Sequence, residues 1–202
     1  MQCPNNEVTE IRWHARGGQG AVTASKTLVE MILPKNMYFQ SFPEFGPERM
    51  GAPIQVFNRI SSSPITVYCG ITTPDIVLVL DVTLLDVVDV TSGLKKNGII
   101  IVNTNLNPDM LSRIYGLQDY RPYTVDATRI ALDTMGKPFA NIPMLGAFLK
   151  ITGLLEKEEA IENLRSSFSK RYPSRIVDMN VKALEHAYKE VKLHEKVGSK
   201  RY

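Results

Sequence analysis

The residues with the clearest capacity for chemistry lie near the N-terminus, in the string Ala15-Arg16-Gly17-Gly18-Gln19-Gly20. This string follows a β-rich run and precedes a stretch with helical periodicity. Glycines at such a junction let the backbone turn tightly and let its N–H groups approach an anion, while the helix N-terminus adds partial positive charge. An arginine there can add a charge-assisted contact to a phosphate. The string therefore predicts either a tight turn without a ligand or a phosphate-binding loop formed by Arg16, Gly17, Gly18, Gln19 and Gly20.

The residues after the loop constrain the kind of ligand. A loop that binds NAD needs an acidic residue about twenty positions further on, where it holds the ribose hydroxyls. The corresponding residues are Phe39, Gln40 and Ser41, and the first acid, Glu44, comes only inside a segment rich in proline and glycine. This favours another phosphate-bearing ligand, such as coenzyme A (CoA), or a backbone contact with another chain.

That segment, residues 41–53, has no helical or strand periodicity and contains three prolines and two glycines. Proline fixes φ and glycine permits unusual φ, so we expect a rigid loop without regular structure. Its charged residues Glu44, Glu48 and Arg49 would then sit on a stiff surface. They form either local ion pairs or the contact with another chain.

The chain offers no complete catalytic set. The nucleophile elbow, the zinc-protease motif and the Walker phosphate loop are all missing from its sequence. The two cysteines, Cys3 and Cys69, have no CxxC spacing, so the sequence offers no four-thiolate zinc or iron–sulfur site. Of the three histidines, His186 and His194 fall on the C-terminal helix, and His14 at a strand end is expected to be structural. We expect neither catalytic residues nor a metal site in this chain.

Composition excludes several other classes. The 202 residues carry a net charge of +3, too small to indicate a nucleic-acid or membrane-surface partner. No apolar run approaches the length of a membrane span, and residues 1–10 lack the apolar core of a signal peptide. A cytoplasmic location is therefore expected.

Short β-rich runs alternate with helical stretches, which is typical of an α/β fold. We predict a Rossmann-like, mostly parallel sheet with flanking helices and a helical C-terminal part, in a single domain over 1–202, with a sheet core at 8–140 and C-terminal helices at 141–196 packing on it. On the last helix an apolar stripe faces the sheet or another subunit: Val177, Val181, Leu184, Tyr188 and Val191. The expected strands are 8–13, 37–40, 54–60, 65–68, 76–80, 99–102 and 123–125, with 54–60 and 65–68 forming a hairpin. The expected helices are 21–32, 84–94, one from Asn107, 128–135, 145–155, 157–168 and 174–196.

Four strings together resemble one known family. They are the glycine loop, residues 39–53 (FQSFPEFGPERMGAP), the short run Val79-Leu80-Asp81, and residues 141–147 (NIPMLGA). In order and separation they are similar to the γ subunits of pyruvate- and other 2-oxoacid:ferredoxin oxidoreductases, over residues 11 to 180. Two departures are small: Ala15 stands where the family has glycine, and Met50 where a second arginine is common.

The resemblance implies one subunit of a multi-chain enzyme, with α, β and δ-type subunits as partners. In this family, thiamine diphosphate with Mg²⁺ decarboxylates the 2-oxoacid, iron–sulfur clusters pass electrons to ferredoxin, and CoA takes the acyl group. The γ part holds neither the thiamine site nor the clusters and is associated with the approach of CoA. The resemblance thus assigns the CoA phosphates to the glycine loop. It assigns Glu44, Glu48 and Arg49 to the contact with the thiamine-binding chains, near the substrate entrance.

Two other functions compete with this one. One is a stand-alone NAD(P)- or CoA-binding Rossmann-type protein, which the glycine loop permits and the missing acid disfavours. The other is a regulator that binds a nucleotide or CoA without catalysis.

Overall fold

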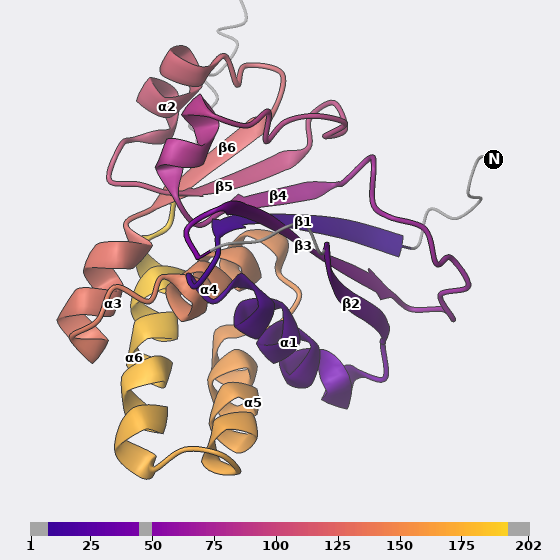
Figure 1. Cartoon of the computed structure of the whole chain (residues 1–202). Helices are drawn as coiled ribbons and strands as arrows, with labels where there is room; N and C mark the ends of the chain where they lie inside the picture. Colours follow the sequence, from indigo (N-terminus) through magenta and orange to yellow (C-terminus); the bar gives the residue numbers. More distant parts are fainter. Residues whose placement is uncertain (1–7, 45–49, 194–202) are drawn as a thin grey trace, which may run out of the picture.

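A computed structural model describes residues 8–44 and 50–193 and contains one seven-stranded sheet (Figure 1). The order across the sheet is β2-β3-β1-β4-β5-β6-β7. The strands are β1 (Val8–Arg16), β2 (Tyr38–Glu44), β3 (Pro53–Ser61), β4 (Ile76–Val79), β5 (Ile99–Asn103), β6 (Arg121–Val125) and β7 (Lys192–Leu193). The helices are α1 (Ala21–Ile32), α2 (Pro108–Tyr115), α3 (Ala127–Met135), α4 (Asn141–Thr152), α5 (Lys157–Ser169) and α6 (Ser174–Glu190), with 3-10 helices η1 (Leu33–Lys35) and η2 (Val82–Asp86).

The centre of the sheet is parallel and its flanks are antiparallel. Strands β1, β4, β5 and β6 run in one direction, whereas β3 pairs antiparallel with β1, β2 with β3, and β7 with β6. Every residue of β4 and β5 is buried, as expected for continuous apolar strands covered on both faces. The predicted α/β class with a mostly parallel core and a helical C-terminal part is thus confirmed.

The two faces of the sheet carry cores of different size. Helices α1, α3, α4, α5 and α6 cover one face, while α2 lies over the other (Figure 1). Alternate residues of each strand serve the two cores: Leu78 joins the large one and Val77 and Val79 the small one under η2 and α2. In the large core the Trp13 indole donates a hydrogen bond of 2.8 Å to the buried Asn58 side chain. This leaves the indole N–H satisfied where water is excluded.

The predicted hairpin between residues 54–60 and 65–68 was wrong. Residues 65–68 form no strand; the hairpin joins β2 to β3 instead. Residues 65–68 are instead held by a side chain of β2, because the Val67 carbonyl accepts a hydrogen bond of 2.9 Å from the Gln40 side chain. A side-chain anchor thus replaces the backbone ladder that the prediction assumed.

The helix predicted over 84–94 was also wrong, since only the short η2 forms and turns follow it. The Asp89 carboxylate accepts hydrogen bonds from the N–H and the hydroxyl of Thr91, an arrangement that competes with helix formation. Gly93 has φ of +70°, and a Cβ there would meet the Thr72 carbonyl oxygen at 1.9 Å. The apolar residues of this segment are buried in part, but their local chemistry favours turns.

The predicted last helix was too long. It ends at Glu190, and Lys192–Leu193 then pairs with β6 as the edge strand β7. The stripe on α6 packs inside this chain, because Val177, Val181 and Leu184 are buried in the large core. No described helix is long and apolar enough to cross a membrane.

Helices α4 and α6 approach closely at Gly146. A Cβ on this glycine would lie 2.3 Å from the Leu184 carbonyl oxygen, a backbone atom that cannot move alone. The string 141–147 therefore includes a residue that sets the distance between two helices.

We predict that Gly146→Ala forces α4 and α6 apart and lowers the free energy of unfolding by about 1–3 kcal/mol. Urea unfolding followed by circular dichroism measures this change. Gly70→Ala is the matched control, since a Cβ at Gly70 meets nothing within 4 Å. Equal stabilities for the two variants would show that the helices tolerate the methyl group.

Candidate functional site

The glycine loop lies at the carboxyl end of β1, beside the parallel strand β4. After β1 the chain enters α1 on one face of the sheet, and after β4 it enters η2 near the other face (Figure 1). Connections that leave neighbouring strands toward opposite faces create a crevice between the strand ends, where α/β proteins bind ligands. The predicted loop therefore stands at the preferred ligand position of this fold.

The loop depends on two glycines with positive φ. Gly18 has φ of +93° and Gly20 of +81°, a region that L side chains rarely adopt. The N–H of Gln19 donates to the Arg16 carbonyl at 3.1 Å, which closes the turn. A second anchor comes from residues just before β3, because Gly17 N–H donates to the Ala52 carbonyl at 2.9 Å. The backbone of the loop is thus fixed from two directions.

Helix α1 begins directly at this loop without a cap. Its N-cap residue is Gly20, so no side chain accepts a hydrogen bond from the first turn, and that turn contains no acidic residue. The first N–H groups of a helix have no partner within it and carry partial positive charge. The start of α1 is therefore suited to an anion such as a phosphate.

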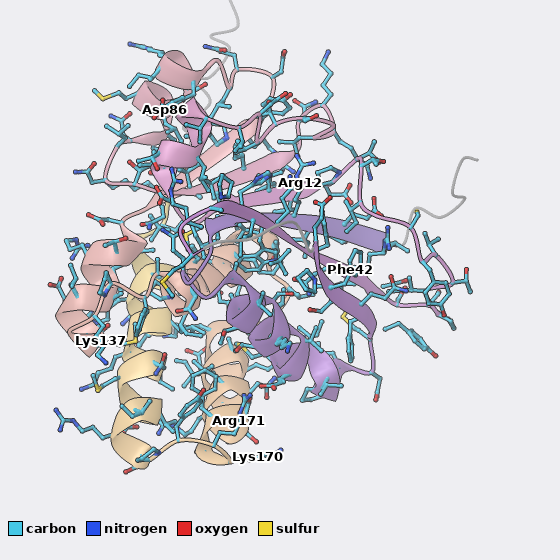
Figure 2. The ribbon with its side chains drawn as sticks, viewed as in Figure 1. Arg12, Phe42, Asp86, Lys137, Lys170 and Arg171 are labelled. Atoms are coloured by element: carbon cyan, nitrogen blue, oxygen red, sulfur yellow. The ribbon has the colours of Figure 1, made fainter. Side chains whose placement is uncertain are left out.

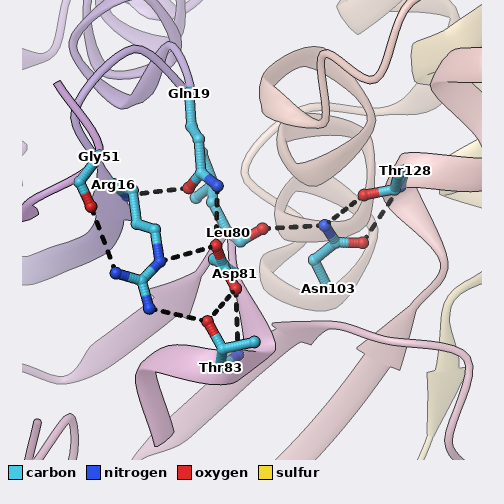
Figure 3. Close-up of polar contacts among 8 residues, drawn as sticks. All are labelled: Arg16, Gln19, Gly51, Leu80, Asp81, Thr83, Asn103 and Thr128. Atoms are coloured by element: carbon cyan, nitrogen blue, oxygen red, sulfur yellow. Dashed lines mark hydrogen bonds and ion pairs between the residues drawn. The ribbon is translucent and has the colours of Figure 1, made fainter. Parts of the chain in front are cut away.

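Arg16 is engaged by its own chain. Its Nε donates to Asp81 Oδ2 at 3.1 Å, its Nη2 to the Thr83 hydroxyl at 2.9 Å and its Nη1 to the Gly51 carbonyl at 3.2 Å (Figure 3). The Gln19 amide donates to the same Asp81 oxygen at 2.9 Å, while its carbonyl accepts from the Arg16 backbone N–H at 2.8 Å. Arg16 and Gln19 thus tie the glycine loop to the end of β4, although the Arg16 side chain stays 29% exposed.

Asp81 is the centre of this network. Partial burial raises its pKa, but hydrogen bonds from Thr83 and Gln19 and the charge of Arg16 together lower it by more, so the net pKa lies below its usual value. The carboxylate is therefore ionised at neutral pH and accepts bonds from both sides of the crevice. Its negative charge also disfavours a phosphate directly at this end of the Arg16 side chain.

A second polar link joins β5 to the same region. The Asn103 amide donates to the Leu80 carbonyl and to the Thr128 hydroxyl, both at 2.8 Å, and its carbonyl accepts from Thr128 N–H (Figure 3). Asn103 follows the apolar residues of β5 as Asp81 follows β4. The sequence analysis did not identify Asp81, Thr83 or Asn103 as site residues, although polar residues after buried strands were a usable signal.

Of the two predicted groups of site residues, the structure describes one in full and only Glu44 of the other. Arg16 to Gly20 lie together, whereas Glu44 ends β2 and faces Gln55 of β3, which in turn faces His14 of β1. Glu44 is exposed and lines a depression of about 570 Å³ that also includes Arg12 and Phe42 (Figure 2). Glu48 and Arg49 lie outside the described residues.

His14 is buried beside the crevice and uncharged. Burial, with a smaller contribution from Arg12, lowers its pKa from 6.5 to about 3, against the opposing charge of Asp89. Its side chain is 3% exposed, which agrees with the structural role expected from the sequence. The described residues contain no cluster of three or more His, Cys, Asp or Glu side chains that could hold a metal ion.

The comparisons with known proteins agree on one family. A family model described as pyruvate ferredoxin/flavodoxin oxidoreductase matches residues 10–190. The pyruvate/ketoisovalerate oxidoreductases common subunit gamma of Pyrococcus abyssi is 42% identical over 186 residues, covering 92% of this chain and 98% of the relative. The crystal structure of the pyruvate oxidoreductase subunit PORC of Thermotoga maritima is 38% identical with a TM-score of 0.81, covering 94% of this chain and 100% of that one.

The chain therefore belongs to the pyruvate ferredoxin/flavodoxin oxidoreductase family. Within this family it is a γ subunit of the pyruvate synthase type. A more distant structure, the 2-oxoglutarate:ferredoxin oxidoreductase of Magnetococcus marinus with 2-oxoglutarate, CoA and succinyl-CoA bound, shares the fold. It has a TM-score of 0.69 at 17% identity and covers 91% of this chain and 31% of that one.

We predict that Asp81→Asn lowers the free energy of unfolding by about 1–3 kcal/mol, because the new amide N–H₂ group faces the donors of Arg16 and Gln19. Urea unfolding measures the loss. Asp133→Asn is the control: its side chain is 57% exposed and pairs with Arg129 at the surface, so its effect stays within about 0.5 kcal/mol. A stable Asp81→Asn protein would mean that the carboxylate does not hold the loop.

The lowered pKa of His14 makes the free energy of unfolding depend on pH. The unfolded chain binds a proton near pH 6.5 and the folded chain only near pH 3, so stability falls as pH drops through this window. We predict that His14→Gln weakens this fall by up to about 1.4 kcal/mol for each pH unit below the unfolded pKa. Urea unfolding at pH 4, 5.5 and 7 measures it, with the exposed His186→Gln as control. Parallel pH profiles for all three proteins would contradict the prediction.

Proposed function

We propose that this chain is the γ subunit of a multi-subunit, thiamine-diphosphate-dependent pyruvate (2-oxoacid):ferredoxin oxidoreductase. The assembled enzyme converts a 2-oxoacid and CoA to acyl-CoA and CO₂ and reduces ferredoxin. Its α, β and δ-type subunits hold thiamine diphosphate, Mg²⁺ and the iron–sulfur clusters. The observation that carries this proposal is 42% identity to a common γ subunit over 98% of that relative.

Pyruvate is the favoured substrate. Similar chains are named pyruvate synthase subunits, and the Pyrococcus relative is common to pyruvate and ketoisovalerate oxidoreductases. A subunit shared between two substrates does not select the 2-oxoacid, so selection belongs to the other chains. The cytoplasmic location stays a prediction.

The role of this chain is to receive the CoA phosphates at the glycine loop. Support comes from the start of α1, where no side chain caps the first N–H groups, and from the positive φ of Gly18 and Gly20 in the loop before it. CoA is bound in the Magnetococcus enzyme, whose chain has the same fold here. Because Arg16 and Gln19 are held by Asp81, and the Gly17 N–H by the Ala52 carbonyl, these three residues position the loop. The backbone of Gly18 and Gly20 then forms the direct contacts.

Glu44, Glu48 and Arg49 contact the thiamine-binding chains near the substrate entrance. Support for this assignment comes from Glu44, which is exposed at the end of an edge strand of the sheet. We also propose that the chain forms a single domain over 1–202, with a sheet core at 8–140 and helices at 141–196 packing on it.

We predict that Gly18→Asp raises the KM for CoA at least fivefold over Gly18→Asn in the assembled enzyme. The two side chains have the same shape and suffer the same backbone strain at φ +93°, so their difference isolates the charge that repels a phosphate. The measurement is anaerobic, CoA- and pyruvate-dependent dye reduction by complexes reconstituted with each variant.

Two further arms complete this experiment. Reconstitution without this chain must abolish activity; full activity in its absence would overturn the subunit assignment. Raising the salt concentration should reduce the difference in the KM for CoA between Gly18→Asp and Gly18→Asn, because salt screens the repulsion between the carboxylate and the phosphate. Identical KM values for the two variants in intact complexes would remove the glycine loop from CoA binding.

A further inference from the structure

The depression beside Glu44 lies over the antiparallel flank of the sheet, beyond the part of this face that α2 and η2 cover (Figure 1). Arg12 pairs with Val77 of the small core, so the Arg12 side chain points to the same face. Across β1, β3 and β2 the register aligns Arg12, Phe57 and Phe42 in one row, and all three line the depression. The connection between β3 and β4 contributes a rim that includes Tyr68.

Arg12 is a buried cation in this depression (Figure 2). It is 5% exposed, and its Nη2 donates to the carbonyls of Val90 and Ser92 at 2.9 and 2.7 Å. Its Nε is buried and has no hydrogen-bond partner in the described part of the chain. The charges of Asp89 and Glu44 act on Arg12, but neither acid forms an ion pair with it. The guanidinium is therefore held in a fixed orientation without a paired carboxylate from residues 8–44 or 50–193.

The charges around Arg12 favour one kind of anion. A guanidinium removed from water without a paired anion is costly, and an entering carboxylate offsets part of this cost. Glu44 also lines the depression, and its negative charge repels a doubly charged phosphate more strongly than a singly charged carboxylate. The electrostatics of the depression thus suit a single carboxylate.

The aromatic residues around Arg12 favour a protein as the source of that carboxylate. The rings of Phe42 and Phe57 lie 5.4 Å apart, and Tyr68 is 89% exposed at the rim. Tyrosine and arginine are enriched at the centres of protein interfaces, where apolar contacts surround a few buried polar ones. The depression is therefore suited to an acidic side chain with an apolar neighbour.

We propose that this depression docks another chain of the enzyme and receives one of its aspartate or glutamate side chains at Arg12. An apolar side chain next to that acid packs against Phe42 and Tyr68. This inference rests on the proposed function, which assigns Glu44 to the contact with the thiamine-binding chains. Because Glu44 lines the same depression, the docked segment belongs to one of those chains.

The test uses Thr72, an exposed residue that also lines the depression. Thr72→Glu and Thr72→Gln add side chains of nearly the same shape, so their difference isolates a negative charge at the rim. In anaerobic reconstitution with the other subunits, Thr72→Glu should need a roughly fivefold higher concentration than Thr72→Gln for half-maximal activity. The kcat at saturation and the KM for CoA should be equal, because the depression only docks a chain.

Arg12→Met tests the cation directly. It should raise the half-maximal concentration roughly tenfold, and raising the salt concentration should weaken association of the unmodified chain more than that of Arg12→Met. Thermal unfolding followed by circular dichroism checks that this variant folds; if it does not, the Thr72 pair decides. Ser166→Glu, exposed on α5 across the sheet, is the control for added charge and should leave association unchanged.

Several results would overturn the inference. Equal half-maximal concentrations for Thr72→Glu and Thr72→Gln, or an equal effect of Ser166→Glu, would remove the carboxylate from the depression. A changed KM for pyruvate with unchanged association would indicate a site for small carboxylates, and self-association of the isolated chain that Thr72→Glu abolishes would indicate a second copy. Where activity still requires this chain, only the docking site is wrong; full activity without the chain refutes the proposed function itself.

Discussion

The shape of the crevice depends on one carboxylate, which accepts hydrogen bonds from the segments on both sides of the crevice. Asp81 accepts from Arg16 and Gln19 of the glycine loop with one oxygen and from Thr83 of η2 with the other. Because glycines supply no side chains of their own, the loop needs such an external anchor to keep a single conformation. The same bonds engage the Arg16 side chain within its own chain, so backbone N–H groups are left to contact an anion.

The flanking strands explain why this loop differs from a dinucleotide site. In a dinucleotide-binding fold the acid that holds the ribose ends the next parallel strand, beside the first one. Here β1 is flanked by the antiparallel β3, and β2 lies one strand further out. No carboxylate of β2 can therefore reach a ribose beside the loop, which gives a structural reason for the absence of an acid at residues 39–41.

Local signals were sufficient for the elements that carry strong patterns. Helix α1 was predicted with its observed bounds, since Gly20 and Pro34 mark its limits, and the two buried strands were evident as continuous apolar runs. The turns after η2 were missed because Asp89 and Gly93 act through specific geometry that periodicity does not report. In the site, the glycine loop was predicted, and the position of Asp81 after a buried strand was a usable signal. Its role as the anchor of the loop could not be predicted, because its partners Arg16 and Gln19 lie 65 and 62 residues away in the chain. Only the folded sheet brings them together.

The contact between Gly20 and Asn141 has an evolutionary consequence. A Cβ at position 20 would lie 2.9 Å from the Asn141 amide nitrogen, so the start of α1 and the start of α4 share one small volume. Any lineage that replaces this glycine must first shorten or redirect the side chain at 141. The two positions are therefore expected to covary across related chains, and each restricts the mutations that the other can accept.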